Sequence, residues 1–217
     1  MKKNNQKSLF AAACCLAAFV LWTLLVQTVD VQSIGPTGSA VGFATLNGYV
    51  RDVIGVHMPL YVLTDWLGLV PIVTAMGFAV FGLAQWIRRK SLRRVDRSIL
   101  ALGVFYIAVA AAYCFFEVAV VNYRPVLIEG ILEASYPSST TLLVMCVMPT
   151  AAMQLGARIK NQVLRRCAVG AIVAFTVLMV IGRLFSGVHW ITDIVGGLLL
   201  SAGLVSTYRA AWKRESL

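Results

Sequence analysis

Long apolar stretches alternate along this chain with short segments that collect most of its charged residues. A helix that crosses a lipid bilayer needs about 20 mostly apolar residues. Six stretches meet that requirement, at about 9–28, 60–86, 98–121, 138–157, 168–187 and 189–211. Because they take up most of the chain, the pattern predicts an all-α, polytopic membrane protein in which residues 1–217 form a single domain, a bundle of six transmembrane helices.

The first apolar stretch follows a basic N-terminus, an arrangement that resembles a secretory signal peptide. The apolar run that begins at Leu9 is long for that role, and no small-x-small cleavage site follows it cleanly. We therefore expect an uncleaved first helix.

The charge distribution gives the expected orientation of the bundle. The chain has a formal net charge of +10. All of its Lys and Arg residues except Arg51, Arg124 and Arg183 gather in four groups: Lys2, Lys3 and Lys7; Arg88, Arg89, Lys90, Arg93, Arg94 and Arg97; Arg158, Lys160, Arg165 and Arg166; and Arg209, Lys213 and Arg214. With six spans all four groups fall on one side, which the positive-inside rule makes cytoplasmic.

We therefore expect a multi-pass protein of the cytoplasmic membrane with both termini in the cytoplasm and anionic lipid beside the basic groups. Since topology accounts for the charge, nucleic acid is not an expected partner. The five cysteines, at positions 14, 15, 114, 146 and 167, have neither metal-ligand spacing nor a disulfide framework. They are expected to be small core residues.

Three polar residues lie together at the edge of apolar segments, where charges are costly. They are Arg183, His189 and Asp193. If the chain is helical from Val188, His189 and Asp193 lie four residues apart on one face, and the carboxylate can orient the imidazole as a nucleophile or base. The alternative is that the pair only satisfies itself inside the bundle while Arg183 extends to the membrane interface.

Two more patches fall at the same predicted end of the bundle. Arg124 is followed by Pro125, which should stop the third helix there. Pro137, among hydroxyl residues at 135–141, marks the start of the fourth helix. A helix start presents free backbone N–H groups and a positive dipole end, so this one could cradle a phosphate beside Arg124 and Arg183. The alternative is ordinary helix capping.

Other polar residues could also reach this end. The glycine-rich segment after Asp30 is expected to be a loop or a short interfacial helix, and His57 follows it. His57 could equally be an exposed loop histidine. Asp65, early in the second span, could equally make a polar contact between helices. Glu117 lies in the third span, seven residues before Arg124.

Together the patches predict one pocket at the extracytoplasmic face, with two arginines and a helix start for phosphate and a histidine backed by an aspartate. Such a site suits phosphoryl transfer through a phosphohistidine. It requires no metal and no cofactor.

The patches resemble the three signature motifs of the phosphatidic acid phosphatase type 2 (PAP2) superfamily, membrane lipid phosphatases whose site design is shared with vanadium haloperoxidases. The first motif, Lys-x6-Arg-Pro, is matched at Arg124 and Pro125. The second, Pro-Ser-Gly-His, is matched at Pro137 and Ser138. The third, Ser-Arg-x5-His-x3-Asp, is matched at Arg183, His189 and Asp193.

The resemblance implies a role for each matching residue. His189 would attack phosphorus and Asp193 would orient it. Phosphate would be bound by Arg124, Arg183 and Ser138, with Ser139 at the same helix start.

Three motif positions differ from the family pattern. Glu117 stands at the first-motif lysine, and Gly182 at the third-motif serine. Ser139 and Thr140 stand where the family has Gly-His, and that histidine is assigned to protonating the leaving group. Thr140 is no general acid near neutral pH, so we expect Glu117, His57 or Asp65 to replace the acid, or a leaving group that needs none.

The expected function is therefore dephosphorylation of a lipid phosphate or diphosphate at the outer leaflet, with a polyprenyl diphosphate as the favoured substrate. The same residues would also suit a phosphotransferase that passes the phosphoryl group to another lipid. A catalytically silent family member that binds or moves phospholipids is the alternative from a different class.

Overall fold

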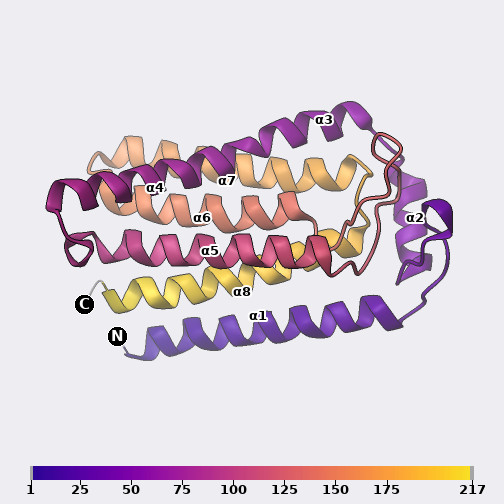
Figure 1. Ribbon diagram of the computed structural model, residues 1–217, viewed down its shortest axis with the longest axis horizontal. Helices are drawn as coiled ribbons and strands as arrows, with labels where there is room; N and C mark the ends of the chain where they lie inside the picture. The colour runs from indigo at the N-terminus through magenta and orange to yellow at the C-terminus, as the bar shows by residue number, and fades with distance from the viewer. Residues whose placement is uncertain (1, 216–217) are drawn as a thin grey trace.

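The computed structural model describes residues 2–215, and the regular structure in this part is helical apart from three isolated β-bridges. The helices form an elongated bundle (Figure 1). They are α1 (Lys2–Thr28), α2 (Ala44–Ile54), α3 (Met58–Leu67), α4 (Leu69–Arg89), α5 (Arg97–Val118), α6 (Ser139–Arg158), α7 (Gln162–Phe185) and α8 (Ile191–Glu215), with short 3-10 turns at Pro36–Gly38 and Leu92–Arg94.

Six helical segments are long and apolar enough to cross a membrane, as the sequence predicts. They are Gln6–Thr28, Met58–Arg89, Arg97–Val118, Ser139–Arg158, Gln162–Phe185 and Ile191–Trp212. The fifth helix begins earlier than the apolar run suggests, because Asn161 caps it. The Asn161 side-chain oxygen accepts hydrogen bonds from the backbone N–H groups of Val163 and Leu164, at 2.9 and 3.0 Å.

The second span is two helices, which its continuous apolar pattern did not indicate. α3 ends at Leu67 and α4 begins at Leu69, with Gly68 between them. Pro71 lies in the first turn of α4, where it has no N–H to continue the hydrogen bonds of α3. Because of this break, Tyr61 and Asp65, which face the site, lie on α3, a helix separate from α4.

α6 and α8 form the centre of the bundle. In both, half of the best membrane-spanning window is buried, against 6–22% in the other four segments. α8 packs along α1 and α6, and α6 packs against α7. Tyr136, Leu142 and Cys146 belong to the buried core at these contacts.

The other cysteines correct the expectation that all five are core residues. Cys14, Cys114 and Cys167 are exposed and Cys15 is intermediate. They lie on helix faces that point away from the bundle, where the lipid around a membrane protein tolerates an apolar side chain.

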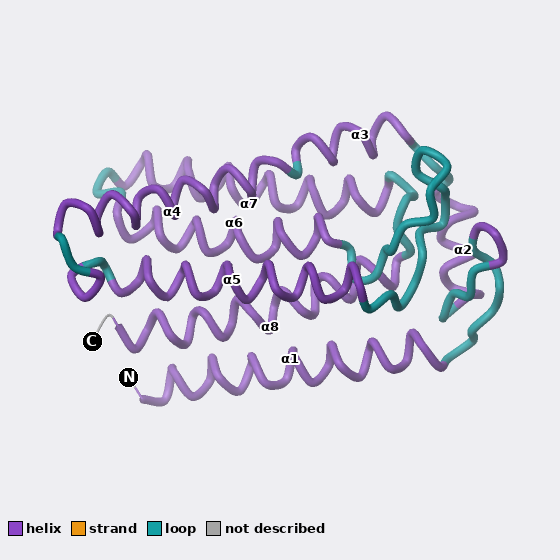
Figure 2. Tube along the Cα trace, viewed as in Figure 1, coloured by secondary structure: helices purple, strands orange, loops and turns teal. Residues whose placement is uncertain are grey.

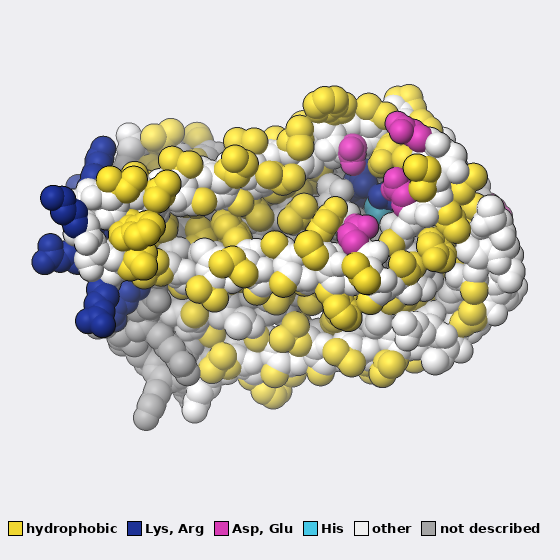
Figure 3. All heavy atoms as spheres, viewed as in Figure 1, with side chains coloured by type: hydrophobic (Ala, Val, Ile, Leu, Met, Phe, Trp, Pro, Cys, Tyr) yellow, Lys and Arg dark blue, Asp and Glu magenta, His cyan; other side chains and the backbone are white. Residues whose placement is uncertain are grey.

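The two ends of the bundle differ in charge. Most of the visible Lys and Arg side chains gather at the end where the termini lie, and Asp and Glu side chains surround a hollow near the other end (Figures 1 and 3). The longer loops are at that second end (Figure 2). The side chains of Lys2, Lys3, Lys213 and Arg214 lie outside the described part of the structure.

α2 lies across the end of the bundle that carries the longer loops (Figure 1). Asn47 fixes it there, because its side-chain nitrogen donates to the Gly42 carbonyl at 2.7 Å and to the Thr192 hydroxyl at 3.0 Å. The segment predicted as loop or short interfacial helix thus contains a helix that covers the start of α8.

Candidate active site

Arg124 is held by the loop between α5 and α6. α5 ends at Val118, earlier than the expected stop at Pro125. The chain then folds back on itself, and the Arg124 N–H donates to the Glu133 carbonyl at 3.0 Å. The same two residues form an ion pair, with 2.9 Å between the Arg124 Nε and Glu133 Oε2 atoms. Arg124 is thereby turned inward and buried.

Arg183 lies in the last turn of α7 and is only 1% exposed, so it does not extend to the membrane interface. Its NH1 atom is 3.4 Å from the Thr64 hydroxyl oxygen and 3.7 Å from Asp65 Oδ1. The ring of Tyr61 lies beneath the guanidinium groups of Arg183 and Arg124, with 5.0 and 5.8 Å from guanidinium carbon to ring centre. These contacts orient both guanidinium groups toward one point.

His189 occupies that point, but not on a helix. α8 begins at Ile191, so the chain is not helical from Val188, the condition under which the sequence placed His189 and Asp193 on one helix face. The helix cannot begin earlier because Asp193, in its first turn, accepts the Trp190 N–H on Oδ2 at 3.0 Å, which is a capping interaction. Asp193 and His189 still face each other, with 3.8 Å between Asp193 Oδ2 and His189 Nδ1.

The arginines determine which nitrogen of His189 carries the proton. Nε2 lies 3.2 Å from Arg183 NH2 and 3.4 Å from Arg124 NH1. A guanidinium group can only donate, so Nε2 must accept and the proton is on Nδ1, facing Asp193. The tautomer with a lone pair on Nε2 is the one that an imidazole nucleophile needs.

The surroundings also keep this imidazole neutral. Burial, followed by the positive charges of Arg124 and Arg183, lowers the pKa of His189 well below its ordinary value of 6.5. Asp193 is fully buried and is held by Asn122, whose side-chain nitrogen donates to Oδ1 at 3.3 Å.

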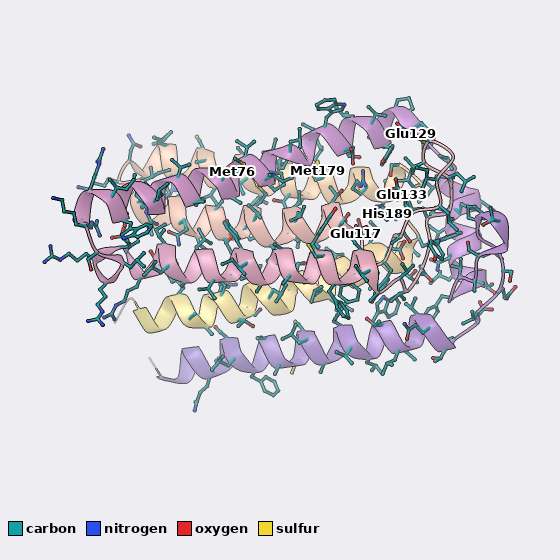
Figure 4. All side chains as sticks on the ribbon, in the orientation of Figure 1. Met76, Glu117, Glu129, Glu133, Met179 and His189 are labelled. Atoms are coloured by element: carbon teal, nitrogen blue, oxygen red, sulfur yellow. The ribbon has the colours of Figure 1, made fainter. Side chains whose placement is uncertain are left out.

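A cavity of about 640 Å³ opens beside these groups. Arg124 and Arg183 line it together with three acidic residues, Asp65, Glu117 and Glu133. The space-filling view shows the hollow with Lys or Arg and His atoms inside it and acidic side chains at its rim (Figure 3), and the labelled side chains of His189, Glu117 and Glu133 lie close together in Figure 4. Leu69, Ile72 and Leu143 give part of the wall an apolar surface.

The start of α6 contributes differently from what the motif suggests. Ser138 is fully buried and its hydroxyl accepts a hydrogen bond from Thr141 at 3.0 Å, whereas Ser139 and Thr140 line the cavity. The Ser138 N–H donates to the Asp193 carbonyl at 3.0 Å. Ser138 therefore connects this helix start to α8, and its two neighbours face the cavity.

Glycines in α8 permit this contact. A side chain at Gly197 would meet the Ser138 carbonyl at 3.2 Å, and one at Gly196 would meet the Tyr136 ring at 2.6 Å. The bare backbone of α8 thus lets the segment before α6 approach closely enough for the bond between Ser138 and Asp193.

The structure distinguishes among the residues that could replace the general acid of the family motif. Asp65, Glu117 and Thr140 line the cavity, but His57 does not. His57 is exposed at the start of α3, and its Nε2 atom lies 2.9 Å from the Ile54 carbonyl.

Three contributors to the site were not predicted from the sequence. Glu133 resembles any acidic loop residue, Tyr61 is part of an apolar span, and Asn122 is a near neighbour of Arg124. Only Asn122, a polar residue at the end of an apolar stretch, carries a signal of its own. Within residues 2–215, no group of three or more His, Cys, Asp or Glu side chains is arranged to hold a metal ion.

Comparison with known proteins gives a family match for the second half of the chain. A family model described as "PAP2 superfamily" matches residues 114–216, a region that contains all three motifs. Over this region the chain is similar to the PAP2 superfamily. No curated protein matches the sequence.

The fold of this protein is similar to a solved structure, "Crystal structure of the first transmembrane PAP2 type phosphatidylglycerolphosphate phosphatase from Bacillus subtilis". The TM-score is 0.61 at 16% sequence identity, over 94% of this chain and 97% of the other. At this identity the comparison supports the all-helical architecture alone.

One departure from the PAP2 motifs has a packing explanation. Gly182 replaces the third-motif serine, and a side chain at this position would meet the Thr64 methyl group at 2.7 Å. Close packing of α7 against α3 therefore requires the glycine, and it brings Thr64 within reach of Arg183.

Proposed function

We propose that this protein removes a phosphoryl group from a membrane lipid through a phosphohistidine at His189. The observation that carries the proposal is the position of His189 Nε2 between the guanidinium groups of Arg183 and Arg124, at 3.2 and 3.4 Å. An acceptor nitrogen surrounded by cationic donors suits a phosphorus atom approached by Nε2, with its oxygens bound by the arginines.

In the first step, Nε2 forms a bond to phosphorus as the bond from phosphorus to the leaving oxygen breaks. The positive charge that develops on the ring is stabilised by Asp193, which faces the proton on Nδ1. In the second step, water attacks the phosphohistidine, phosphate leaves and Nε2 regains its lone pair.

The leaving group favours a polyprenyl diphosphate as substrate. Cleaving an alcohol phosphate expels a basic alkoxide that needs a proton, whereas cleaving a diphosphate expels a lipid monophosphate, a far weaker base. Thr140 lines the cavity where the family motif has a histidine, and a hydroxyl cannot supply that proton. The apolar wall at Leu69, Ile72 and Leu143 supports a lipid tail beside the reacting group.

Phosphate release measures the activity. Wild type and His189→Ala are compared on polyprenyl diphosphate, phosphatidate and phosphatidylglycerol phosphate, the lipid for which the Bacillus subtilis phosphatase of similar fold is named. We expect the diphosphate to be hydrolysed fastest and His189→Ala to be inactive on all three. Radioactive phosphate transferred to an added lipid instead of to water would indicate a phosphotransferase, and full activity of His189→Ala would refute the phosphohistidine.

We also infer that the site faces the outside of the cytoplasmic membrane. The basic groups between α4 and α5 and between α6 and α7 lie at the end opposite His189, and such groups remain on the cytoplasmic side. A reporter fused after Ser33 should read as external, and one fused after Ser91 as cytoplasmic. The reverse pair of readings would place the site inside the cell.

A further inference from the structure

Trp190 directly follows the nucleophile in the chain and is the largest fully buried side chain in the described part of the protein, with 1% of its surface exposed. A buried indole N–H needs an acceptor. Here the Nε1 atom donates to the Tyr123 carbonyl at 2.7 Å. Because Tyr123 directly precedes Arg124, this hydrogen bond joins the chain neighbours of His189 and Arg124, which are 65 residues apart in the sequence.

No shared helix sets the distance between His189 and Arg124. His189 lies between α7 and α8, and Arg124 lies in the loop between α5 and α6. Contacts between these two segments must therefore place the two groups. The Ser138 N–H and the Asn122 side chain both donate to Asp193, at 3.0 and 3.3 Å. The indole bond is shorter, and it joins the two segments beside His189 itself.

Arg183 is placed differently, by its own helix. It belongs to the last turn of α7. The Ser186 N–H donates to the Gly182 carbonyl at 2.9 Å, and the Ser186 hydroxyl donates to the Arg183 carbonyl at 2.7 Å. Only six residues separate Arg183 from His189. The spacing of these two residues is thus local, whereas the spacing of His189 and Arg124 depends on a bond across the fold.

The ring of Trp190 is held firmly enough to set a distance. The backbone N–H of Trp190 donates to Asp193 Oδ2 at 3.0 Å. The guanidinium carbon of Arg51, on α2, lies 5.7 Å from the centre of the ring, as in a cation–π contact. A tryptophan side chain has only two torsion angles, so little freedom remains once its backbone, its ring face and its N–H are all in contact.

We propose that Trp190 is a positioning residue, and that its bond to the Tyr123 carbonyl sets the distance between the nucleophile His189 and Arg124. Trp190 does not line the active-site cavity, so it acts through its neighbours. It stands at one of the three unspecified positions between His189 and Asp193 in the third motif. The proposal rests on the phosphohistidine function proposed above and deepens it.

The distance matters because both groups act on one phosphoryl group. Nε2 lies 3.4 Å from Arg124 NH1, so phosphorus can bond to Nε2 while Arg124 binds its oxygens. A misplacement of about 1 Å can cost about 10²-fold in rate. Without the indole bond, Arg124 loses this restraint and can shift together with Glu133, its ion-pair partner at 2.9 Å.

The test removes an indole N–H at two matched places. Trp190→Phe loses the bond to Tyr123. The control is Trp22→Phe, because Trp22 Nε1 donates to the Thr192 carbonyl at 3.1 Å, also at the start of α8 but beside neither arginine. On the lipid that wild type hydrolyses fastest, we expect kcat of Trp190→Phe to fall about tenfold, part of the effect of a 1 Å misplacement. Its KM should change little, and Trp22→Phe should keep the wild-type kcat.

A double-mutant cycle separates positioning from general packing. Arg124→Lys and Arg183→Lys keep a positive charge but lose the planar guanidinium group. If Trp190 places Arg124, adding Trp190→Phe should lower kcat by about twofold or less in Arg124→Lys and still by about tenfold in Arg183→Lys. Release of radioactive phosphate makes slow variants measurable. An equal loss in both backgrounds would mean that Trp190 only supports the fold, and it would overturn the proposal.

Replacement of Trp190 by 3-benzothienylalanine keeps the shape of the fused rings and exchanges only the N–H for sulfur, so the result does not depend on how phenylalanine packs. This variant should show the same loss in kcat while thermal unfolding in detergent shows that it is folded. Wild-type kcat in this variant would overturn the role of Trp190 and leave the phosphatase function intact. Activity that survives in His189→Ala would instead refute the phosphohistidine function on which the proposal rests.

Discussion

The Nε2 atom of His189 accepts from Arg183 NH2 at 3.2 Å, so the nucleophile and a phosphate-binding group are in contact before substrate arrives. A substrate phosphate must enter between them. It then takes the arginine's hydrogen bonds onto its oxygens and exposes the Nε2 lone pair to phosphorus. The same contact disfavours a proton on Nε2, which would set a third positive charge beside Arg183 and Arg124.

The pH dependence of activity should reflect this contact. Because the pKa of His189 is lowered well below 6.5, the neutral, nucleophilic ring persists as the solution becomes acidic. The acid limb of kcat/KM that belongs to His189 should therefore lie below pH 6.5. Phosphorus NMR measures the titration of the substrate phosphate, and the contribution of this titration is subtracted from the pH profile of kcat/KM. A remaining limb centred at or above pH 6.5 would mean that the ring is not shielded from protons as described.

Asp193 should act on catalysis through the orientation of His189. Asp193→Asn keeps the shape of the side chain but presents an amide where the proton on Nδ1 needs an acceptor. We expect kcat to fall by about 10⁴-fold, as for amidation of the aspartate in a protease triad, with normal expression and thermal stability in detergent. Asn122→Ala, which removes the bond to Asp193 Oδ1, should give a smaller loss. Near-full activity of Asp193→Asn would reduce Asp193 to a capping residue of α8.

The sequence predicted the six spans because each membrane-spanning helix requires a long run of apolar residues, and such runs are easily recognised in a sequence. It also predicted that Arg124, Arg183, His189 and the start of α6 meet, since these motifs fall at the same ends of alternating spans. In the structure Arg124, Arg183 and the start of α6 line one cavity, and both arginines contact His189 Nε2.

What the sequence could not predict depends on caps and on contacts between distant segments. The start of α8 is decided by Asp193 capping Trp190, a local competition that a pattern of apolar residues does not record. The pairing of Arg124 with Glu133 depends on how the loop after α5 folds back. Ser138 turns inward because Asp193 and Thr141 satisfy it, which leaves Ser139 to face the cavity.

Glu133 should compete with phosphate for Arg124. Its carboxylate lies 2.9 Å from Arg124 Nε, so an entering phosphate oxygen gains less from this arginine than it would from an unpaired one. Glu133→Gln removes the competing charge. We therefore expect inorganic phosphate to inhibit the variant at a several-fold lower concentration than it inhibits wild type, since an ion pair worth about 1 kcal/mol changes a binding constant by about that factor. Product-inhibition constants measure this, with Glu129→Gln as the control. An unchanged or higher constant would show that Glu133 holds Arg124 in its working position instead.

Thr140 offers the test of the leaving-group argument. It lines the cavity at the position where the family motif has its histidine, so a histidine introduced there is placed to donate a proton. General acid catalysis is worth typically 10²–10⁴-fold where the leaving group needs it, and far less where the leaving group is a weak base. We therefore expect Thr140→His to raise turnover of phosphatidate by at least about tenfold relative to turnover of a polyprenyl diphosphate.

The decisive quantity is the ratio of the two turnover rates in wild type and in Thr140→His, measured in the same detergent. His57→Ala is the control for the protein's other histidine, which lies outside the cavity, and it should leave the ratio unchanged. If wild type already hydrolyses phosphatidate faster than the diphosphate, and Asp65→Asn or Glu117→Gln abolishes that activity, then one of these acids has taken over the proton transfer. In that case the missing histidine has been replaced from α3 or α5, and the preference for a weakly basic leaving group no longer follows.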